Sequence, residues 1–173
     1  MPDYGISLDE RYRIAPFAGA GDVSEQAVID LWTREHAVPA AEAQGRIHEV
    51  LLVGVERDEG VVSVSTAYLQ RNRQLGMDLW YFRLFVASAH RRSKLAVLLA
   101  LMSRDHLQER FVTGRDTRGS GVLYEVANEG LKRYRNEALW LPVEFTFIGQ
   151  NPRGDHVRVC YFPGAQAPGP PPR

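Results

Sequence analysis

The apolar positions in the first half of the chain alternate between strand and helix patterns. Residues 12–16 read as a short strand, and Val28, Leu31 and Trp32 then fall on one face of a helix. Asp22 is the expected N-cap of this helix, because Glu25 follows it at the spacing of a capping box. Pro39 ends the helix or starts a short second one that runs through Ala43.

Two runs rich in β-branched residues, 50–56 and 61–69, predict a pair of antiparallel strands. Arg57-Asp58-Glu59-Gly60 joins them and reads as a tight turn, because glycine tolerates the positive φ that such turns require. A polar loop is expected over residues 70–78. The almost continuously apolar run 79–86 then indicates a central strand that is covered on both faces.

The second half of the chain starts with an apolar helix, which we expect to run from Leu95 to about Arg110. A loop rich in glycine and arginine follows. The remaining expected elements are a strand at 121–127, a helix at 128–137, and a hairpin of strands 143–148 and 157–162 that turns at Asn151-Pro152-Arg153-Gly154.

Length and composition indicate one folded domain. The chain has 173 residues, of which 45% are apolar and 24% charged, as in soluble globular proteins. We expect a single domain over residues 1–163 and a disordered tail over residues 164–173, which are rich in proline and glycine and have no apolar anchor. No apolar run reaches the length of a membrane span, and no signal peptide is evident, so we expect a cytoplasmic protein with no membrane partner.

The charge balance and the metal-binding residue types narrow the chemistry. A formal net charge of zero argues against a general nucleic-acid partner. Cys160 is the only cysteine, and the five histidines show no metal-ligand spacing, so we expect neither a disulfide nor a metal cofactor.

The most informative segment joins the apolar strand at 79–86 to the helix that begins at Leu95. Four basic side chains, those of His90, Arg91, Arg92 and Lys94, lie where the helix begins. A helix N-terminus already has a partial positive charge and unpaired N–H groups, so cations there are unfavourable unless an anion shares the site. The pattern therefore predicts an anion site, with phosphate as the first candidate.

This segment resembles motif A of the GCN5-related N-acetyltransferases, in which a valine ends the fourth strand and an Arg/Gln-x-x-Gly-x-Gly/Ala loop binds the pyrophosphate of acetyl-CoA. Val86, Arg91, Lys94 and Ala96 occupy the matching positions, although Lys94 stands where the family has its central glycine. The resemblance implies an α/β (α+β) fold, with a mostly antiparallel sheet of about seven strands flanked by about four helices. The order of the elements along the chain agrees with it.

The resemblance also implies site residues. Acetyl-CoA or another acyl-CoA would be the co-substrate, bound by Phe85, Val86, Arg91, Arg92, Ser93, Lys94, Leu95, Ala96 and Asn128. In the family a tyrosine seven residues after this asparagine protonates the leaving thiolate. Here Arg135 is at that position and Tyr134 lies one residue earlier, so Tyr134 is the candidate general acid. An ammonium must lose a proton before it can attack, so the reaction needs a base. Glu125, near the end of the expected strand at 121–127, is the candidate general base.

Three functions follow from these residues. The first is transfer of an acyl group from CoA to the amine of a small molecule or a peptide, in a bacterial enzyme. Its oligomeric state, with a homodimer among the options, stays open. The second is a binding or regulatory protein that has lost catalysis, which the lysine at the glycine position and the shifted tyrosine favour. The third is an acyltransferase that uses an acyl-carrier protein, whose acidic surface would dock on the basic loop. The acceptor itself stays open.

Overall fold

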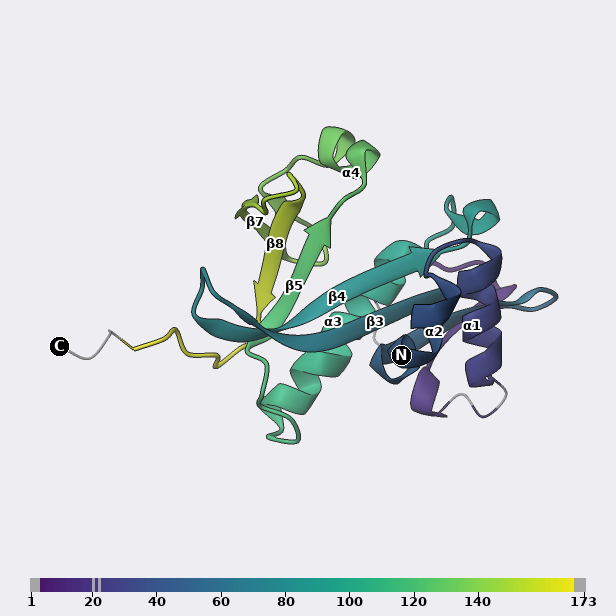
Figure 1. Cartoon of the computed structure of the whole chain (residues 1–173), viewed down its shortest axis with the longest axis horizontal. Coiled ribbons are helices and arrows are strands. Elements are labelled where there is room, and N and C mark those ends of the chain that lie inside the picture. The colour runs from purple at the N-terminus through teal and green to yellow at the C-terminus, as the bar shows by residue number, and fades with distance from the viewer. Residues whose placement is uncertain (1–3, 20, 22, 170–173) are drawn as a thin grey trace. The chain divides into compact units, whose positions relative to one another are not determined.

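The computed structural model describes residues 4–19, 21 and 23–169. The strands form one eight-stranded sheet, in the order β1-β2-β3-β4-β5-β8-β7-β6 (Figure 1). By its internal contacts the chain divides into two compact units, residues 1–67 with 84–103 and residues 68–83 with 104–173. Strands β3 and β4 and helix α3 contribute residues to both units, and each unit is described separately below.

The first unit holds the N-terminal strands and the helices that pack on them. Its elements are β1 (Tyr12–Pro16), α1 (Glu25–Arg34), α2 (Ala40–Arg46), β2 (Val50–Glu56), the first part of β3 (Gly60–Asn72), the end of β4 (Met77–Val86) and the start of α3 (Leu95–Val112); short 3-10 turns lie at Phe17–Gly19, Ile47–Glu49 and Ser88–His90. Strand β1 pairs antiparallel with β2, and β2 with β3.

Local sequence signals explain most of this unit. The apolar face Val28, Leu31 and Trp32 is buried, as the spacing predicts. Gly60 has φ +80° at the β2–β3 turn, which confirms the predicted glycine turn. The helix cap is different: Ser24 is the N-cap and its side chain accepts from the N–H of Ala27, whereas Asp22 lies outside the described residues. Ser24 is the N-cap because it directly precedes Glu25, the first helical residue.

The second unit is built around the only parallel strand pair in the described sheet. β4 pairs in parallel with β5 (Gly121–Val126), and α3 is the crossover between them. The other elements are α4 (Glu129–Tyr134), β6 (Leu139–Trp140), β7 (Phe145–Gln150) and β8 (His156–Tyr161). Gly121 lies so close to β8 that a Cβ would be 2.5 Å from the Cys160 carbonyl oxygen. Met77, Leu79, Tyr81, Leu123 and Val159 form a core of this unit.

The structure departs from the predicted elements at three places. Residues 70–72 and 77–78, expected in a loop, extend β3 and β4. Gln70 and Arg71 are polar and exposed in the extended strand, whereas Met77 is buried in the core of this unit. Helix α4 ends at Tyr134 instead of near Glu137, and β6 was not predicted. The count of four α-helices and a mostly antiparallel sheet is confirmed, with eight strands where about seven were expected.

Candidate active site

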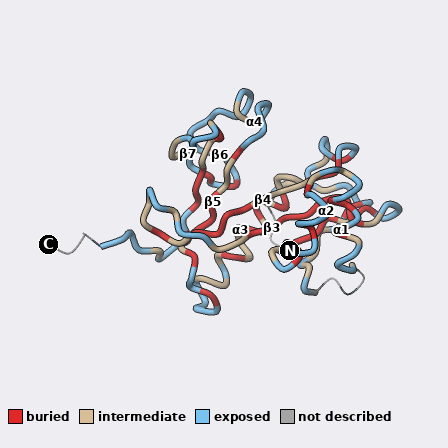
Figure 2. Tube along the Cα trace, in the orientation of Figure 1, coloured by how far each residue is buried: buried red, intermediate tan, exposed pale blue. Residues whose placement is uncertain are grey.

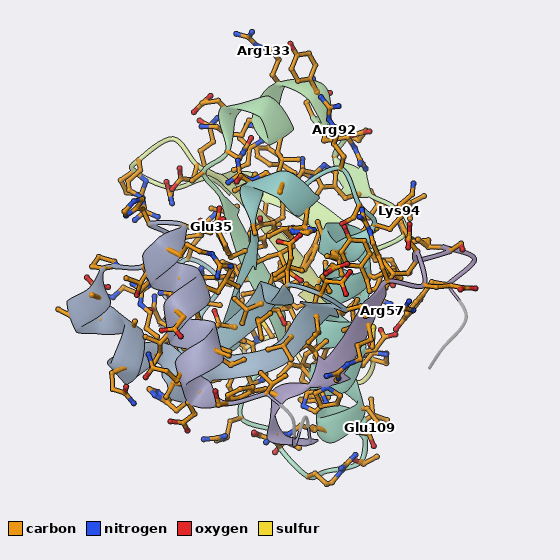
Figure 3. The ribbon with its side chains drawn as sticks, turned by 90° about the vertical axis from the view of Figure 1, so that its right-hand side faces the viewer. Glu35, Arg57, Arg92, Lys94, Glu109 and Arg133 are labelled. Atoms are coloured by element: carbon orange, nitrogen blue, oxygen red, sulfur yellow. The ribbon has the colours of Figure 1, made fainter. Side chains whose placement is uncertain are left out.

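The basic loop in the first unit joins the end of β4 to the start of α3. Val86 ends the strand in a buried position, and Leu95 begins the helix and is fully buried. Arg91, Arg92 and Lys94 are exposed between them, and Figure 3 shows the labelled Arg92 and Lys94 side chains extending away from the ribbon. The predicted strand, basic loop and helix are therefore confirmed, and three cations of the loop are accessible to a ligand.

Ser93 shapes the turn that opens the helix. Its N–H and its hydroxyl both donate to the His90 carbonyl, at 3.0 and 2.7 Å, and its Oγ accepts from the N–H of Leu95 at 3.3 Å. Within the described residues, the N–H groups of Ala96 and Val97 have no hydrogen-bond acceptor. These donors, the positive end of the helix and the nearby cations are the features expected of an anion site, as the sequence predicts.

His90 anchors the loop from beneath and was not among the predicted site residues. Its imidazole is 5% exposed and lies with Nδ1 2.9 Å from the Tyr12 hydroxyl and Nε2 3.2 Å from Oε2 of Glu59. Because a carboxylate only accepts, Nε2 carries a hydrogen in the contact with Glu59. The sequence gives His90 only as one of four basic residues, and nothing local shows that it is buried.

Two further contacts hold the loop at the end where it leaves β4. A carboxylate oxygen of Glu35, the residue that caps the end of α1, accepts from the N–H of Ser88 at 3.1 Å. This hydrogen bond lowers the pKa of Glu35 below its ordinary value. At the same end, the Arg91 guanidinium donates from Nε to the Val86 carbonyl at 3.4 Å. The loop is thus tied to helix α1 and to strand β4.

Lys94 occupies the position of the family glycine without backbone strain. Among the described residues other than glycine, only His36 and Glu144 have positive φ, so Lys94 keeps an ordinary backbone conformation. Its side chain is exposed and adds a charge beside the helix N-terminus. This backbone conformation accommodates a side chain, so the Cβ of Lys94 lies at a position where the motif A pattern has a glycine.

Phe85 and Val86, the predicted strand positions of the site, are bound into the core of the first unit. Val86 is buried among its members and Phe85 packs against it while partly exposed. Just beyond them, the N–H of Ala87 donates to the Val62 carbonyl at 2.8 Å. These side chains hold the strand in place whatever its backbone binds.

In the second unit, Asn128 and Tyr134 mark the two ends of α4. The Asn128 side chain accepts from the N–H of Leu131 at 3.0 Å and is the N-cap of the helix. This cap occupies its carbonyl oxygen and leaves its amide NH₂ for other contacts. Tyr134, the last helical residue, is 76% exposed. Its hydroxyl makes no hydrogen bond within the described part of the chain.

Glu125, the candidate base, belongs to a polar network at the turn between β7 and β8. Its carboxylate accepts from the Asn151 amide at 3.1 Å and from the Arg153 guanidinium at 3.1 Å. Asp155 shares both partners, and its hydrogen bond from Asn151 lowers the pKa of its carboxyl. These contacts explain Glu125 as part of a structured turn, and whether it also accepts a proton is not decided by them.

Neither a metal-binding cluster nor a membrane-spanning helix is found among the described residues. No group of three or more histidine, cysteine, aspartate or glutamate side chains among them is placed to hold a metal ion. In the same residues, no helix is long and apolar enough to cross a membrane.

No protein-family model and no curated protein matches the sequence. Solved structures do resemble the fold. A GNAT-family acetyltransferase from Streptococcus pneumoniae has a TM-score of 0.58 at 8% identity, over 88% of this chain and 99% of that one. The AtaTR complex bound to acetyl-CoA scores 0.56 at 10% identity, over 88% and 95%. Naa50 of Arabidopsis thaliana, in complex with the bisubstrate analogue CoA-Ac-MVNAL, scores 0.52 at 13% identity, over 88% and 99%.

These matches span nearly the whole of each neighbour. One neighbour is a GNAT-family acetyltransferase, and the other two bind acetyl-CoA or a CoA-containing analogue. The strand, basic loop and helix of this chain agree independently with motif A, and the described residues include the crossover helix between two parallel strands. The chain therefore has the fold of the GCN5-related N-acetyltransferases.

Proposed function

We propose that this protein is an acyl-CoA-dependent N-acyltransferase, with acetyl-CoA as the first donor to test. One observation carries the proposal. On this fold, the N–H groups of Ala96 and Val97, which have no hydrogen-bond acceptor in the described residues, lie at the N-terminus of α3 beside three exposed basic side chains of the loop. A pyrophosphate is the anion that such a cradle suits, because it accepts several N–H bonds and carries charge to match the cations. The CoA-bearing neighbours support the same assignment.

The reaction that we propose is direct attack. A neutral amine attacks the thioester carbonyl, the C–N bond forms, and the C–S bond then breaks to release CoA thiolate. Glu125 takes the proton that the amine loses, directly or through water, and Tyr134 gives a proton to the thiolate. Amide and free CoA are the products. We propose a small-molecule or peptide amine as acceptor, which the peptide part of the analogue bound to Naa50 supports.

Binding is tested by the unfolding temperature of the protein with millimolar acetyl-CoA and with CoA. A ligand that binds only the folded state raises this temperature in proportion to the logarithm of its concentration above Kd. Turnover is tested by release of free thiol over a panel of amines and peptides. The absence of any shift would refute the cofactor assignment.

A second candidate is a protein that binds CoA without catalysis. It is favoured by Tyr134, which is exposed and without a hydrogen-bond partner in the described residues, and by Glu125, which is held by Arg153. Saturable CoA binding combined with no thiol release over the panel would select this alternative. The third candidate, an acyl-carrier protein as donor, would show no affinity for free CoA.

A further inference from the structure

The second unit buries an arginine that the proposed chemistry does not use. Strand β8 lies between β5 and β7 in the sheet (Figure 1), and its residue Arg158 is fully buried. No carboxylate of the described residues forms an ion pair with it; Glu137, whose charge acts on Arg158, pairs with Arg135 instead. Burial lowers the pKa of the Arg158 guanidinium below its ordinary value, and the charge of Glu137 opposes this shift. A buried charge without an ion pair is costly, so its other contacts must compensate for the burial.

Those contacts are one aromatic ring and two backbone carbonyls. The guanidinium carbon lies 3.9 Å from the centre of the Trp140 ring, within the range of a cation–π contact. Nη1 donates to the Phe145 carbonyl at 3.5 Å and Nη2 to the Arg135 carbonyl at 3.4 Å, while Nε has no partner in the described residues. The sheet brings these groups together, because Trp140 is opposite Phe145 where β6 pairs with β7, and β7 in turn pairs with β8.

The Arg135 carbonyl accepts from both of these side chains. Nε1 of Trp140 donates to it at 2.6 Å, and Arg158 adds the longer bond at 3.4 Å. Because the Arg158 guanidinium also stacks on the indole, it supports the ring that makes the short bond. We call Trp140 and Arg158 together the carbonyl clamp.

The residue held by the carbonyl clamp ends the helix that carries Tyr134. Arg135 is the C-cap of α4, and its N–H donates to the Leu131 carbonyl at 2.9 Å. The last carbonyls of a helix have no partner within it. Helix α4 has six residues and none of them is buried, so its own packing contributes little to its position. The carbonyl clamp therefore fixes the backbone that follows Tyr134, while the tyrosine side chain stays exposed.

We propose that Arg158 is a positioning residue for Tyr134. With Trp140 it holds the backbone after the tyrosine, and it thereby limits where the hydroxyl can lie during the reaction. This inference rests on the proposed function, because the position of the hydroxyl affects the rate only if Tyr134 gives a proton to the thiolate. Arg158 is fully buried and acts only through the backbone.

The kinetic test is Arg158→Met, which removes the charge and the donors and keeps an unbranched apolar side chain. We expect kcat to fall about 10-fold or more, since a small misplacement of a reacting group is costly, while the Kd of acetyl-CoA stays nearly unchanged. In a Tyr134→Phe background the same substitution should change kcat by less than about twofold, because two residues that act through one interaction are not additive. An additive loss in that background would overturn the proposal, since Arg158 would then act through another group.

Arg104→Met is the matched control. The Arg104 side chain is 11% exposed and also donates to backbone carbonyls of the second unit, those of Pro142 and Val143. We expect this variant to be less stable but to keep the kcat of the wild type when it is folded. An equal loss of kcat would show that any disturbance of this unit slows the reaction, and it would also overturn the proposal.

Trp140→Phe tests the carbonyl clamp if Arg158→Met does not fold. It keeps a ring for the guanidinium and removes only the 2.6 Å bond to the Arg135 carbonyl. We expect it to lower kcat and, like Arg158→Met, to have almost no effect in the Tyr134→Phe background. Wild-type kcat in a folded Trp140→Phe protein would contradict the role of the carbonyl clamp.

Hydrogen exchange measures the carbonyl clamp without turnover. The Arg135 N–H should exchange about 10-fold faster in Arg158→Met and in Trp140→Phe than in the wild type, and no faster in Arg104→Met. Unchanged exchange in both clamp variants would refute the clamp even if turnover is normal. A wild type that releases no thiol with any amine would instead refute the proposed function, and the positioning role of Arg158 with it.

Discussion

The loop at residues 88–94 and the short helix α4 carry the candidate chemistry in opposite ways. The loop is exposed in its cations but is held from below by a buried histidine, by Glu35 and by the serine turn. Helix α4 has no buried residue, and beyond its caps it is held mainly by Lys132, which donates to the Gly154 carbonyl at 3.2 Å. In Figure 2 helix α4 is largely exposed, whereas β5 before it is largely buried.

The difference separates binding from catalysis. A cradle for a charged cofactor must be preorganised, because each donor that has to be ordered upon binding costs entropy. A proton donor on an exposed helix can be ordered by the substrates themselves, since catalytic hydrogen bonds are often long or absent in the free enzyme. We therefore expect substitutions in the loop to affect CoA affinity and substitutions in α4 to affect turnover.

The sharpest test of this division is Tyr134→Phe. If the hydroxyl protonates the leaving thiolate, turnover falls about 10- to 1,000-fold, because the lost interaction exists mainly in the transition state. The affinity for CoA stays nearly unchanged. Steady-state kinetics and calorimetry on the same preparation check both values, and Tyr161→Phe, an exposed tyrosine on β8, is the control. Unchanged turnover would show that water protonates the thiolate.

His90→Ala removes the anchor below the loop. We expect a loss of about 2 to 3 kcal/mol in the free energy of unfolding, since the Tyr12 hydroxyl is left buried without its partner. Acetyl-CoA affinity should fall about 10-fold while kcat at saturation changes little. Urea unfolding and calorimetry measure the two effects.

The control for His90 is Tyr12→Phe, which deletes only the hydroxyl and should cost about 1 kcal/mol. Normal affinity for CoA in a folded His90→Ala protein would mean that the loop keeps its shape without the anchor. The basic loop would then be no better organised than α4.

Arg91→Ala tests the cations of the loop directly. Loss of one charged hydrogen bond should reduce CoA binding by about 1 to 3 kcal/mol. The control is Arg73→Ala, an exposed arginine in the turn between β3 and β4. Arg118 is unsuitable as a control, because it is paired with Asp116 and its loss would disturb that turn. Equal losses from Arg91 and Arg73 would indicate diffuse attraction and remove the assignment of the loop as a specific cradle.

Glu35→Gln has the smallest expected effect and shows it through pH. The hydrogen bond from Ser88 lowers the pKa of Glu35 in the folded state. The ionised carboxylate therefore stabilises the native state at pH values above the unfolded-state pKa, and this stabilisation is lost as the pH falls through the folded-state pKa. We expect the variant to be less stable by under about 1 kcal/mol at pH 7. At a pH below the folded-state pKa of Glu35, urea unfolding should show no difference in stability between the variant and the wild type. A difference that persists there would exclude ionisation as its cause.

The features that could be predicted from the sequence depend on local patterns of residues. The apolar face of α1, the Gly60 turn and the strand, loop and helix around Arg91 each depend on residues within a few positions of one another. The strand ends at residues 70–72 and 77–78 were predicted wrongly as loop, because strand extension depends on a neighbouring strand that the local pattern does not show.

By itself the sequence determined the order of the elements apart from β6, and the basic residues of the loop between strand and helix, since helix and strand periodicity is local. It also located Asn128, although its role as a cap depends on where α4 begins. Only the tertiary structure placed His90 against Tyr12 and Glu59, residues 78 and 31 positions away in the chain. It likewise brought Arg158 to Trp140, because the register of β6 on β7 and of β7 on β8 is set by packing over whole strands and not by any residue alone.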